Sequence, residues 1–595
     1  MRKNKRLLCV CLSALMLFLS GCNLYRLPDL ENHNLDDFYK EDAKVYHTLY
    51  SSELLSLDYL NADPTDYNEI YANVIDTLID YDSFGHEMPG LALSWESNED
   101  TTVWTFHLRD DATWVDYNGN YYDKVVADDW VCASEHAQEK NDLTNIDYSV
   151  EALDDVTLVY TLEKPCPFFT SMLSGYNFLP VSRSFYDKMG TLFAKDYMSL
   201  LYNGAYILHY FQPFEQQILV KNPSYWDKDN VFIDRVENYY DYDTADVSVE
   251  AFLKGDVDKA IIPYDYLQEY LDDPELSKYI HQSRPDSTIS YFYAFNFNPK
   301  FDEKYEPENW AKAVVNENFR KAIMFSLDRE TLVSIYDPYE PQNLISNTIT
   351  PPRSLWVDGK DYTSLSALSS IAGRDSFSSA QAKYYRKIAK QELYEAGVKF
   401  PIKVLMPYDP SVSGWKKEAY AAEVMIETTL GRGFVDVIVE AGNDADFTEY
   451  VVEQGKYAFT KNRWMASYSD PLTWAEAFND DNEYTFWNRC QDAKIKFIYA
   501  KWKFNVIEGT NIYYSTERRY NAFAEAEKIL INNAIVVPIS ILNGDGYKMC
   551  KLNEFEGEYA PYGNANIRYK YLHLYDESMS FEEYQEAYNK WLKGF

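Results

Sequence analysis

Four pairs of adjacent carboxylates are the residues in this sequence that could serve acid–base hydrolysis. Two carboxyl groups flanking a bond can act as general acid and as base or nucleophile. The pairs are Asp110 and Asp111, Asp128 and Asp129, Asp154 and Asp155, and Asp480 and Asp481. Because the chain holds 94 Asp and Glu residues, adjacent pairs are expected by chance. The sequence also lacks GxSxG, HExxH, a P-loop and the dinucleotide-binding glycine pattern. We therefore predict that the protein is not an enzyme.

Histidine and cysteine are the other residue types that could bind a metal. The eight histidines are scattered, and none has the spacing of metal ligands. Four cysteines beyond the N-terminal segment show no CxxC spacing: Cys132, Cys166, Cys490 and Cys550. We predict no metal and no other cofactor, and free buried thiols at these four positions. One disulfide outside the cell is the alternative.

The composition is that of a globular protein with a large excess of negative charge. The chain has 595 residues, the size of about two to four domains. Its 56 Lys and Arg and 94 Asp and Glu residues give a net charge of −38. This charge argues against nucleic acid as a partner, because phosphate binding requires a basic face. The 54 tyrosines suit a binding cleft, or they form a Tyr-rich surface that arose by compositional drift.

The N-terminus has the pattern of a lipoprotein signal. Residues 1–6 carry four basic side chains, and an apolar run follows over 7–19. The run is shorter than the roughly 20 residues of a membrane span, but it has the length of a signal-peptide core. It ends in LSGC (19–22), which resembles a bacterial lipobox, whose cysteine is lipidated. We predict a signal peptide over 1–21, a tether over 22–44 lipidated at Cys22, and an extracellular location on the outer face of the bacterial cytoplasmic membrane. An ordinary secretory signal or a buried cysteine is the alternative.

The helices and strands that would position a site are predicted in mixed order along the chain, which is typical of an α/β protein. Alternating apolar residues predict strands at 104–108 and 156–162, and apolar spacing predicts helices around 319–327 and 523–530. A separate α/β lobe is predicted from two helices that end at glycines, each followed by a strand: 379–396, 402–406, 415–430 and 435–439. Residues 580–592 predict a terminal amphipathic helix that packs on the first lobe.

Several sequence blocks resemble, in their order, the extracellular solute-binding proteins of oligopeptide ABC transporters, the family 5 solute-binding lipoproteins. The first blocks are PGLALSWE (89–96), WTFHLRD (104–110), ATW (112–114) and VADDW (126–130). The likeness continues at VEALDD (150–155), LEKP (162–165), NGAY (203–206), KNPSYW (221–226), FRKA (319–322), SLDR (326–329) and WMASYSDP (464–471). It therefore covers most of the mature chain.

The resemblance implies an α/β fold of the periplasmic-binding-protein type II, in which two lobes close over the ligand and a third domain enlarges the cleft. By the family's interrupted layout, lobe I collects 45–75, 205–285 and 540–595. Domain II is then 76–204, and lobe III is 286–539.

The resemblance also implies the ligand and the partners. An extended oligopeptide would pair its backbone with a protein strand, while its side chains occupy roomy hydrated pockets. The expected protein partners are the permease and ATPase of an ABC importer, and the receptor itself is expected to be a monomer.

Two segments match family positions that border the ligand. Residues 52–58 resemble the family's first strand, and Glu53, Leu54 and Leu55 are the candidate contacts there. Residues 464–471 resemble the segment that pairs with the peptide, and the candidate contacts are Trp464, Met465, Ala466, Ser467 and Asp470. In the family this segment reads Asp-Tyr-x-Asp/Glu-Pro, and its leading Asp binds the N-terminal ammonium of the peptide. In this sequence Ser467 occupies that position.

A serine cannot neutralise an ammonium group, so two alternatives stay open. Either Asp470 or Glu53 supplies the carboxylate, or the terminus of the ligand is not anchored there. The second alternative admits longer peptides, blocked peptides or another class of ligand. Tyr291, Tyr293 and Asn296 precede the family's crossover into the third domain and are expected near the cleft mouth, or they pack within a buried strand.

Two other functions stay open at this point. A peptide-sensing or adhesive surface lipoprotein with the same fold would need no permease. The same fold could instead hold an oligosaccharide or a metal chelate. Aromatic residues stack on sugars, whereas the scarcity of histidine disfavours a metal bound directly.

Overall fold

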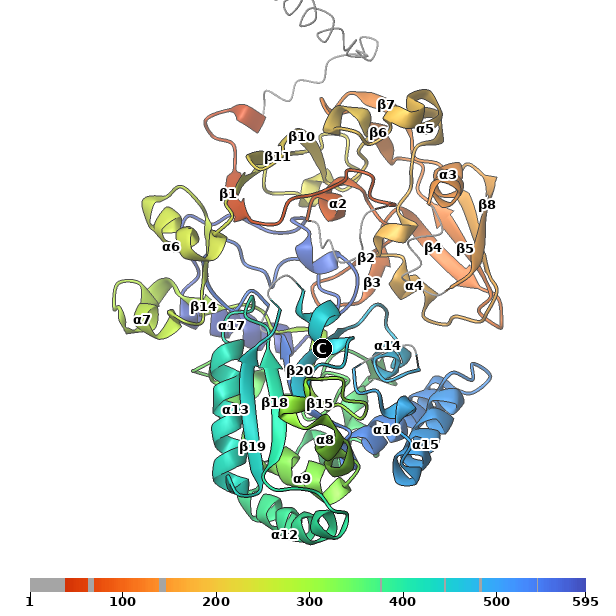
Figure 1. Cartoon of the computed structure of the whole chain (residues 1–595). Coiled ribbons are helices and arrows are strands. Elements are labelled where there is room, and N and C mark those ends of the chain that lie inside the picture. Colours follow the sequence, from red (N-terminus) through yellow and green to blue (C-terminus); the bar gives the residue numbers. More distant parts are fainter. Residues whose placement is uncertain are drawn as a thin grey trace, which may run out of the picture.

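The computed structural model describes residues 38–61, 69–137, 146–374, 377–443, 446–480, 484–542 and 544–594. The predicted signal peptide, Cys22 and most of the predicted tether lie outside these ranges. The chain forms two halves, drawn mainly in red to yellow above and in green to cyan below (Figure 1). Within the described ranges, no helix combines the length and the apolar composition that crossing a membrane would require.

Two four-stranded sheets form much of the upper half. The first has the order β1 (Val45–Tyr50), β12 (Arg235–Tyr240), β11 (Gln216–Lys221) and β10 (Tyr206–Gln212), with β1 parallel to β12. The second is antiparallel and has the order β4 (Ala92–Ser97), β5 (Val103–Leu108), β9 (Thr157–Leu162) and β8 (Tyr148–Asp154). In β5 every second side chain is buried, as a sheet with one core face requires. The strands predicted at 104–108 and 156–162 are thus confirmed.

Short elements complete the upper half. The hairpins are β2 (Ile79–Tyr81) with β3 (Glu87–Pro89), and β6 (Thr113–Val115) with β7 (Tyr121–Lys124). The helices are α2 (Glu69–Val74), α3 (Asp128–His136), α4 (Phe169–Met172), α5 (Arg183–Met189), α6 (Thr244–Lys254) and α7 (Leu267–Asp272).

The lower half is built around β15 (Asp286–Phe295), which pairs with β20 (Phe459–Met465) on one side and β21 (Val536–Leu542) on the other. Beside it, the parallel strands β18 (Ile402–Tyr408) and β19 (Val435–Ala441) are joined through α13 (Trp415–Leu430), since a parallel pair needs a crossover connection. The other helices of this half are α8 (Pro307–Val314), α9 (Glu317–Ser326), α10 (Arg329–Val333), α11 (Ser369–Ala372), α12 (Ser379–Glu395), α14 (Leu472–Glu476), α15 (Ala493–Gly509) and α16 (Thr516–Asn532).

Local signals explain where the predicted helices end. Gly397 and Gly431 have φ angles of 73° and 83°, which glycine adopts without strain, and they follow α12 and α13 as predicted. At the other end of a helix, the Asn316 side chain accepts a hydrogen bond from the Phe319 amide at 2.8 Å and caps α9. The helices predicted around 319–327, 379–396, 415–430 and 523–530 are confirmed, as are the strands predicted at 402–406 and 435–439.

The chain crosses twice between the two halves through a small sheet. This sheet has the order β13 (Lys259–Ile262), β22 (Tyr547–Cys550) and β14 (His281–Gln282). One crossing leads from β14 into β15 and the other returns from β21 into β22. The terminal helix α17 (Phe581–Leu592) packs on β14, and the Tyr584 hydroxyl donates to the Ser283 carbonyl at 2.8 Å. The predicted terminal helix is therefore present, and it contacts the first crossing.

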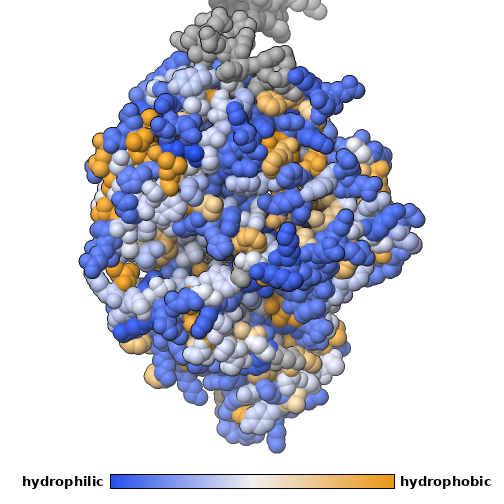
Figure 2. Space-filling view, turned by 180° about the vertical axis from the view of Figure 1, so that it is seen from behind, coloured by the Kyte–Doolittle hydropathy of each residue, from blue (hydrophilic) through white to orange (hydrophobic). Residues whose placement is uncertain are grey.

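Each half has its own hydrophobic core. One cluster of buried side chains falls within 292–541, and another collects residues from 46–236 together with Tyr468 and residues from 550–572. Cys132, Cys166, Cys490 and Cys550 are buried and free, as predicted. The face in Figure 2 is mostly hydrophilic, with hydrophobic residues in small separate groups.

Candidate functional site

Three neighbouring cavities lie where the two halves and the crossings meet. A cavity of about 400 Å³ is lined by Tyr46 of β1, by Arg284 and Asp286 of the first crossing, and by residues of the second crossing and the C-terminal segment. A cavity of about 280 Å³ shares Tyr559 with it, and one of about 180 Å³ shares Gly544 and Asp545. The cavities therefore follow one another along the boundary between the halves. A larger cavity, of about 650 Å³, shares Cys550 and Leu552 with the 400 Å³ cavity, but residues 550–590 alone line it and the lower half contributes none of them.

The second crossing depends on two glycines. Gly544 and Gly546 have φ angles of 45° and 78°. A Cβ atom on Gly544 would lie 2.8 Å from the Ser283 Cβ, and one on Gly546 would lie 2.8 Å from the Tyr264 Cζ. A side chain at either position would collide with the other crossing or with the upper half.

Contacts between the halves flank the cavities at both ends. At one end the Phe168 and Tyr468 rings stack with centroids 4.4 Å apart, and the Ser469 amide donates to the Ser171 hydroxyl at 2.9 Å. At the other end the Tyr264 and Tyr336 rings meet edge to face at 5.1 Å. Nearby, the Lys417 ammonium pairs with Asp265 at 2.8 Å. The two halves are therefore in contact at both ends of the row of cavities.

In the segment after β1, the Glu53 carboxylate accepts hydrogen bonds from two backbone amides, one adjacent in sequence and one distant. Glu53 accepts from the amide of Leu54 at 2.9 Å and from the amide of Phe214 at 2.5 Å. Leu54 is buried, whereas 84% of the Leu55 side chain is exposed. Glu53 therefore orders the segment, and Leu55 is its exposed apolar group.

Neighbouring residues hold the last two residues of β20 and the segment that follows it, and Ser467 in that segment is left exposed. The Trp464 indole N–H donates to the Thr473 carbonyl at 2.6 Å, and the Ala466 amide donates to the Thr288 carbonyl at 2.8 Å. Met465 pairs with Ile289 of β15. Ser467 is exposed, and its amide donates to the Thr473 hydroxyl at 3.0 Å.

Asp470 is buried and already paired. Its carboxylate accepts from the Arg519 guanidinium at 2.9 Å and from the Leu472 amide at 3.0 Å. Burial raises the pKa of Asp470, while Arg519 opposes the shift. This carboxylate is therefore already engaged in an ion pair and a hydrogen bond within the lower half.

The three candidates on and after β15 lie in different surroundings. Tyr291 lines the 180 Å³ cavity. Tyr293 is buried, and its hydroxyl donates to Glu418 at 3.0 Å. The Asn296 amide group donates to the carbonyls of Gly455 and Tyr457 at 3.0 and 2.8 Å, and it is fully buried. Of the three, only Tyr291 lines one of the boundary cavities.

An ion pair surrounded by aromatic rings borders the 180 Å³ cavity. The Lys461 ammonium pairs with Glu418 and lies 4.7 to 4.8 Å from the ring centres of Tyr291, Tyr336 and Trp415. Glu418 also accepts from the Tyr336 hydroxyl at 2.6 Å. Burial lowers the pKa of Lys461, and the pairing with Glu418 opposes this shift. The pair is neutral as a unit, so the cavity favours an uncharged, largely apolar group.

A buried arginine lines the 400 Å³ cavity without an ion-pair partner among the described residues. The Arg284 guanidinium donates to the Glu558 carbonyl at 3.0 Å and lies over the Tyr559 ring at 4.7 Å. Its Nη1 has no hydrogen-bond partner in the described structure. Burial lowers the pKa of Arg284. Glu554 and Asp286 line the same cavity and partly offset the charge of Arg284, so an entering carboxylate would chiefly satisfy the unpartnered Nη1.

Sequence patterns did not single out Arg284, Lys461 or Tyr559. Lys461 stands in β20 within the polar run TKNR (460–463), so no local pattern separates it from its polar neighbours. No local signal marks Arg284 either.

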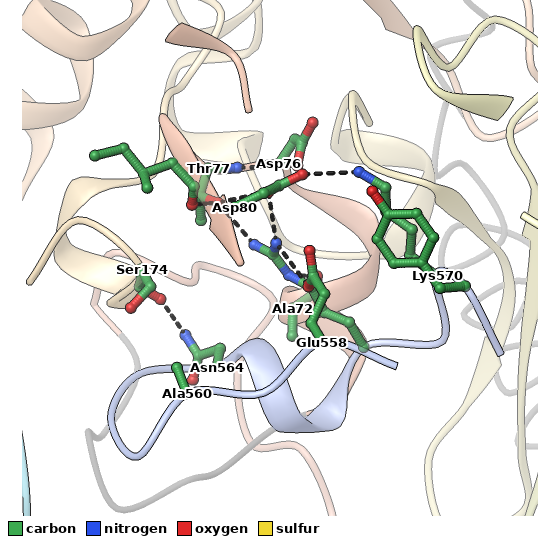
Figure 3. A network of polar contacts seen from close by, with 12 residues as sticks. Ala72, Asp76, Thr77, Asp80, Ser174, Glu558, Ala560, Asn564 and Lys570 are labelled. Carbon is green, nitrogen blue, oxygen red and sulfur yellow. Dashed lines mark hydrogen bonds and ion pairs between the residues drawn. The ribbon is translucent and has the colours of Figure 1, made fainter. Parts of the chain in front are cut away.

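The C-terminal segment is fastened to the upper half by a buried polar network (Figure 3). Asp80 accepts from the Arg568 guanidinium at 2.8 Å and from the Lys570 ammonium at 2.7 Å. Arg568 also donates to the Thr77 hydroxyl at 2.8 Å and pairs with Glu558 at 3.2 Å. Because Tyr559 and Arg568 line the 400 Å³ cavity, this network fixes one wall of the candidate site.

Comparison with known proteins decides the family. Residues 87–486, about two thirds of the chain, match the model of the bacterial extracellular solute-binding proteins, family 5. The chain belongs to this family. The resemblance seen in the sequence is confirmed, and the family to which the chain belongs is one of solute-binding proteins.

Curated relatives match the family 5 protein over nearly its whole length. It is 28% identical to the oligopeptide-binding protein AliB of Streptococcus pneumoniae, over 93% of this chain and 92% of AliB. It is 26% identical to the periplasmic oligopeptide-binding protein OppA of Salmonella typhimurium, over 82% of this chain and 85% of OppA.

Solved structures share the fold of the family 5 protein. Listeria monocytogenes OppA bound to peptide aligns with a TM-score of 0.63 and 20% identity, over 90% of this chain and 99% of OppA. The unliganded open form of MppA, a periplasmic murein tripeptide binding protein, also aligns with a TM-score of 0.63 and 20% sequence identity, over 90% of this chain and 98% of MppA. The predicted α/β fold of the type II periplasmic binding proteins, with several domains, is confirmed.

Proposed function

We propose that the protein is a lipid-anchored extracellular receptor that binds oligopeptides between its halves and delivers them to the permease and ATPase of an ABC importer. The row of cavities along the boundary between the halves carries this proposal. Relatives named as oligopeptide-binding proteins, aligned over almost the whole chain, support the class of ligand. The two crossings are the hinge about which the halves would open and close.

The proposed anchor rests on the sequence, since Cys22 lies outside the described residues. Lipidation there would hold the receptor at the outer face of the cytoplasmic membrane through the tether of 22–44. Cys22→Ser should abolish incorporation of labelled fatty acid into the protein. Incorporation that persists in the Cys22→Ser protein would refute the proposed anchor.

We propose the predicted domain layout as the working division of the receptor. Lobe I would combine 45–75, 205–285 and 540–595, with domain II at 76–204 and lobe III at 286–539. Separate hydrophobic clusters support the distinction between lobe III and the rest. We further propose that the receptor acts as a monomer.

The peptide would lie extended beside the exposed segment that follows β20, close to Ser467. Neither of the two candidate carboxylates, Asp470 and Glu53, is free to pair with the peptide's N-terminal ammonium. Asp470 is paired with Arg519, and Glu53 accepts two backbone N–H groups. These existing interactions of Asp470 and Glu53 support the alternative in which no carboxylate binds the peptide N-terminus. The receptor would then accept longer or N-blocked peptides.

Two cavities offer chemistry for the rest of the ligand. Arg284 would receive a carboxylate, either the C-terminus of the peptide or an acidic side chain. The 180 Å³ cavity beside Tyr291 would receive one large apolar side chain. Affinity would otherwise come from backbone pairing, which depends little on peptide sequence.

Calorimetric titration of the protein from residue 23 onward with defined oligopeptides tests the proposed function. Oligosaccharides of similar length are the matched negative ligands. Saturable binding of peptides, with no heat from the oligosaccharides, is the expected result. Binding of an oligosaccharide that excludes peptides would refute the proposal.

A further inference from the structure

Helix α15 presents an exposed apolar stripe that no described residue covers. It pairs with α16 at the outer edge of the lower half (Figure 1). Its inner face is buried through Ile495, Trp502 and Val506. On its outer face, 60% of Phe497, 62% of Phe504 and 59% of Ile507 are exposed.

The exposed residues form one continuous stripe. Phe497, Ala500, Phe504 and Ile507 follow one another at steps of three or four residues, and all four are exposed. At 3.6 residues per turn they fall within about 80° of the helix circumference. Isolated exposed apolar residues are common on protein surfaces, but an aligned set with two phenylalanines is not explained by that.

Lysines border this stripe on both sides. Lys496 and Lys503 lie along one edge, and Lys494 and Lys501 lie along the other, by the same helical spacing. Glu508 is the only acidic residue within the helix, although the whole chain has a net charge of −38. Lys503 pairs with Asp480, and Lys501 lies over the Phe497 ring at 4.5 Å. Helix α15 is thus a basic, apolar strip on an acidic protein.

We propose that α15 is a membrane-contact helix that binds the interface of bilayers containing anionic lipid. Because Lys503 is paired with Asp480, an occupant of this strip must be apolar along its centre and negatively charged beside Lys494, Lys496 and Lys501. A bilayer interface meets both requirements, since phenylalanine enters the acyl boundary while lysines extend toward anionic headgroups. An acidic groove on another protein is the competing occupant.

This contact would orient the protein on the membrane. The lipid proposed at Cys22 would hold only the N-terminal end of the tether at the bilayer, whereas α15 would hold one face of the folded protein against it. The proposal does not depend on peptide binding, because neither apolar nor basic residues of the strip line the boundary cavities.

Vesicle sedimentation tests the proposal with the chain from residue 23 onward, which contains every described residue but no lipid. We expect it to sediment with vesicles of phosphatidylglycerol and phosphatidylcholine, and not with phosphatidylcholine alone. Phe497→Ser with Phe504→Ser should weaken binding about tenfold. Tyr420→Ser with Val424→Ser is the control, because these residues are 46% and 60% exposed on α13 and should leave vesicle binding unchanged.

Lys494→Gln with Lys501→Gln gives an independent variant at exposed positions. It should remove the preference for anionic vesicles while peptide binding, measured by calorimetry, is retained. Failure of the unaltered protein to bind anionic vesicles would overturn the proposal, as would equal binding by the serine variant of α15 and the control. Retention on the purified permease without any vesicle binding would assign the strip to a protein partner and equally overturn it.

Discussion

Introducing a carboxylate at Ser467 should create recognition of the peptide N-terminus. Ser467 is exposed after β20, at the position where the family resemblance expects an aspartate. In the structure Asp470 and Glu53 are both committed to other groups, so Ser467→Asp would supply a free carboxylate. Because the side chain is exposed, the change should cost little folding stability.

The gain in binding free energy that Ser467→Asp gives to the free peptide should lie between two limits. An exposed ion pair contributes about 0.2–1 kcal/mol. Two unit charges 4 Å apart near a protein surface attract by about 4 kcal/mol at an effective dielectric of about 20. Closure of the halves removes part of the water around Ser467, so we expect about 1–2 kcal/mol, or about 5- to 30-fold in Kd.

Calorimetry with one peptide in two forms, free and N-acetylated, measures this gain. The free peptide should bind Ser467→Asp more tightly than the unaltered protein, whereas the acetylated peptide should not. Ser370→Asp, another exposed serine, adds the same charge elsewhere and should change neither Kd. The reasoning fails if acetylation already weakens binding to the unaltered protein tenfold or more, or if both forms gain equally from the aspartate.

Three further predictions follow from buried charges. Arg284→Gln should weaken binding of a peptide with a free carboxylate about tenfold or more, because hydrogen bonds to charged groups contribute about 1.5–3 kcal/mol. It should leave binding of a fully amidated peptide unaffected. Calorimetry of both peptides with the unaltered protein and with Arg284→Gln tests this. Lys570→Met should lower the free energy of unfolding by about 3 kcal/mol in urea titrations, because it removes one of two cations from buried Asp80, and an unchanged value would show that Arg568 alone suffices. Burial raises the pKa of the Glu527 carboxyl to about 7, so its protonation stabilises the folded state below pH 4.5 and this contribution, about 3 kcal/mol, is lost as the pH rises to 7. Glu527→Gln should therefore gain Tm relative to the unaltered protein between pH 5 and 7, and a constant Tm difference over this interval would contradict the assignment.

Elements with strong local signals were predictable from sequence. The repeated order of helix, glycine and strand between 379 and 441 was recovered almost to the residue, because each helix end is set by a glycine at positive φ. Strand β5 was predictable for a similar reason, since its alternation records a single buried face.

The ion pairs and hydrogen bonds of the candidate site and its walls were not predictable from the sequence, because they join residues far apart in the chain. Asp470 looked like a free carboxylate for a ligand, yet Arg519 reaches it from α16. Asn296 looked like a cleft residue, yet its amide group binds two carbonyls of the segment before β20. Asp80 meets Arg568 and Lys570 across almost the whole sequence. Such pairings depend on tertiary packing, which local patterns do not encode.

Native mass spectrometry of the protein from residue 23 onward, purified from cells without added ligand, tests the central claim most directly. The account predicts a heterogeneous added mass that is released as peptides on denaturation, including peptides with blocked or variable N-termini. A single discrete non-peptide mass bound between the halves would contradict it.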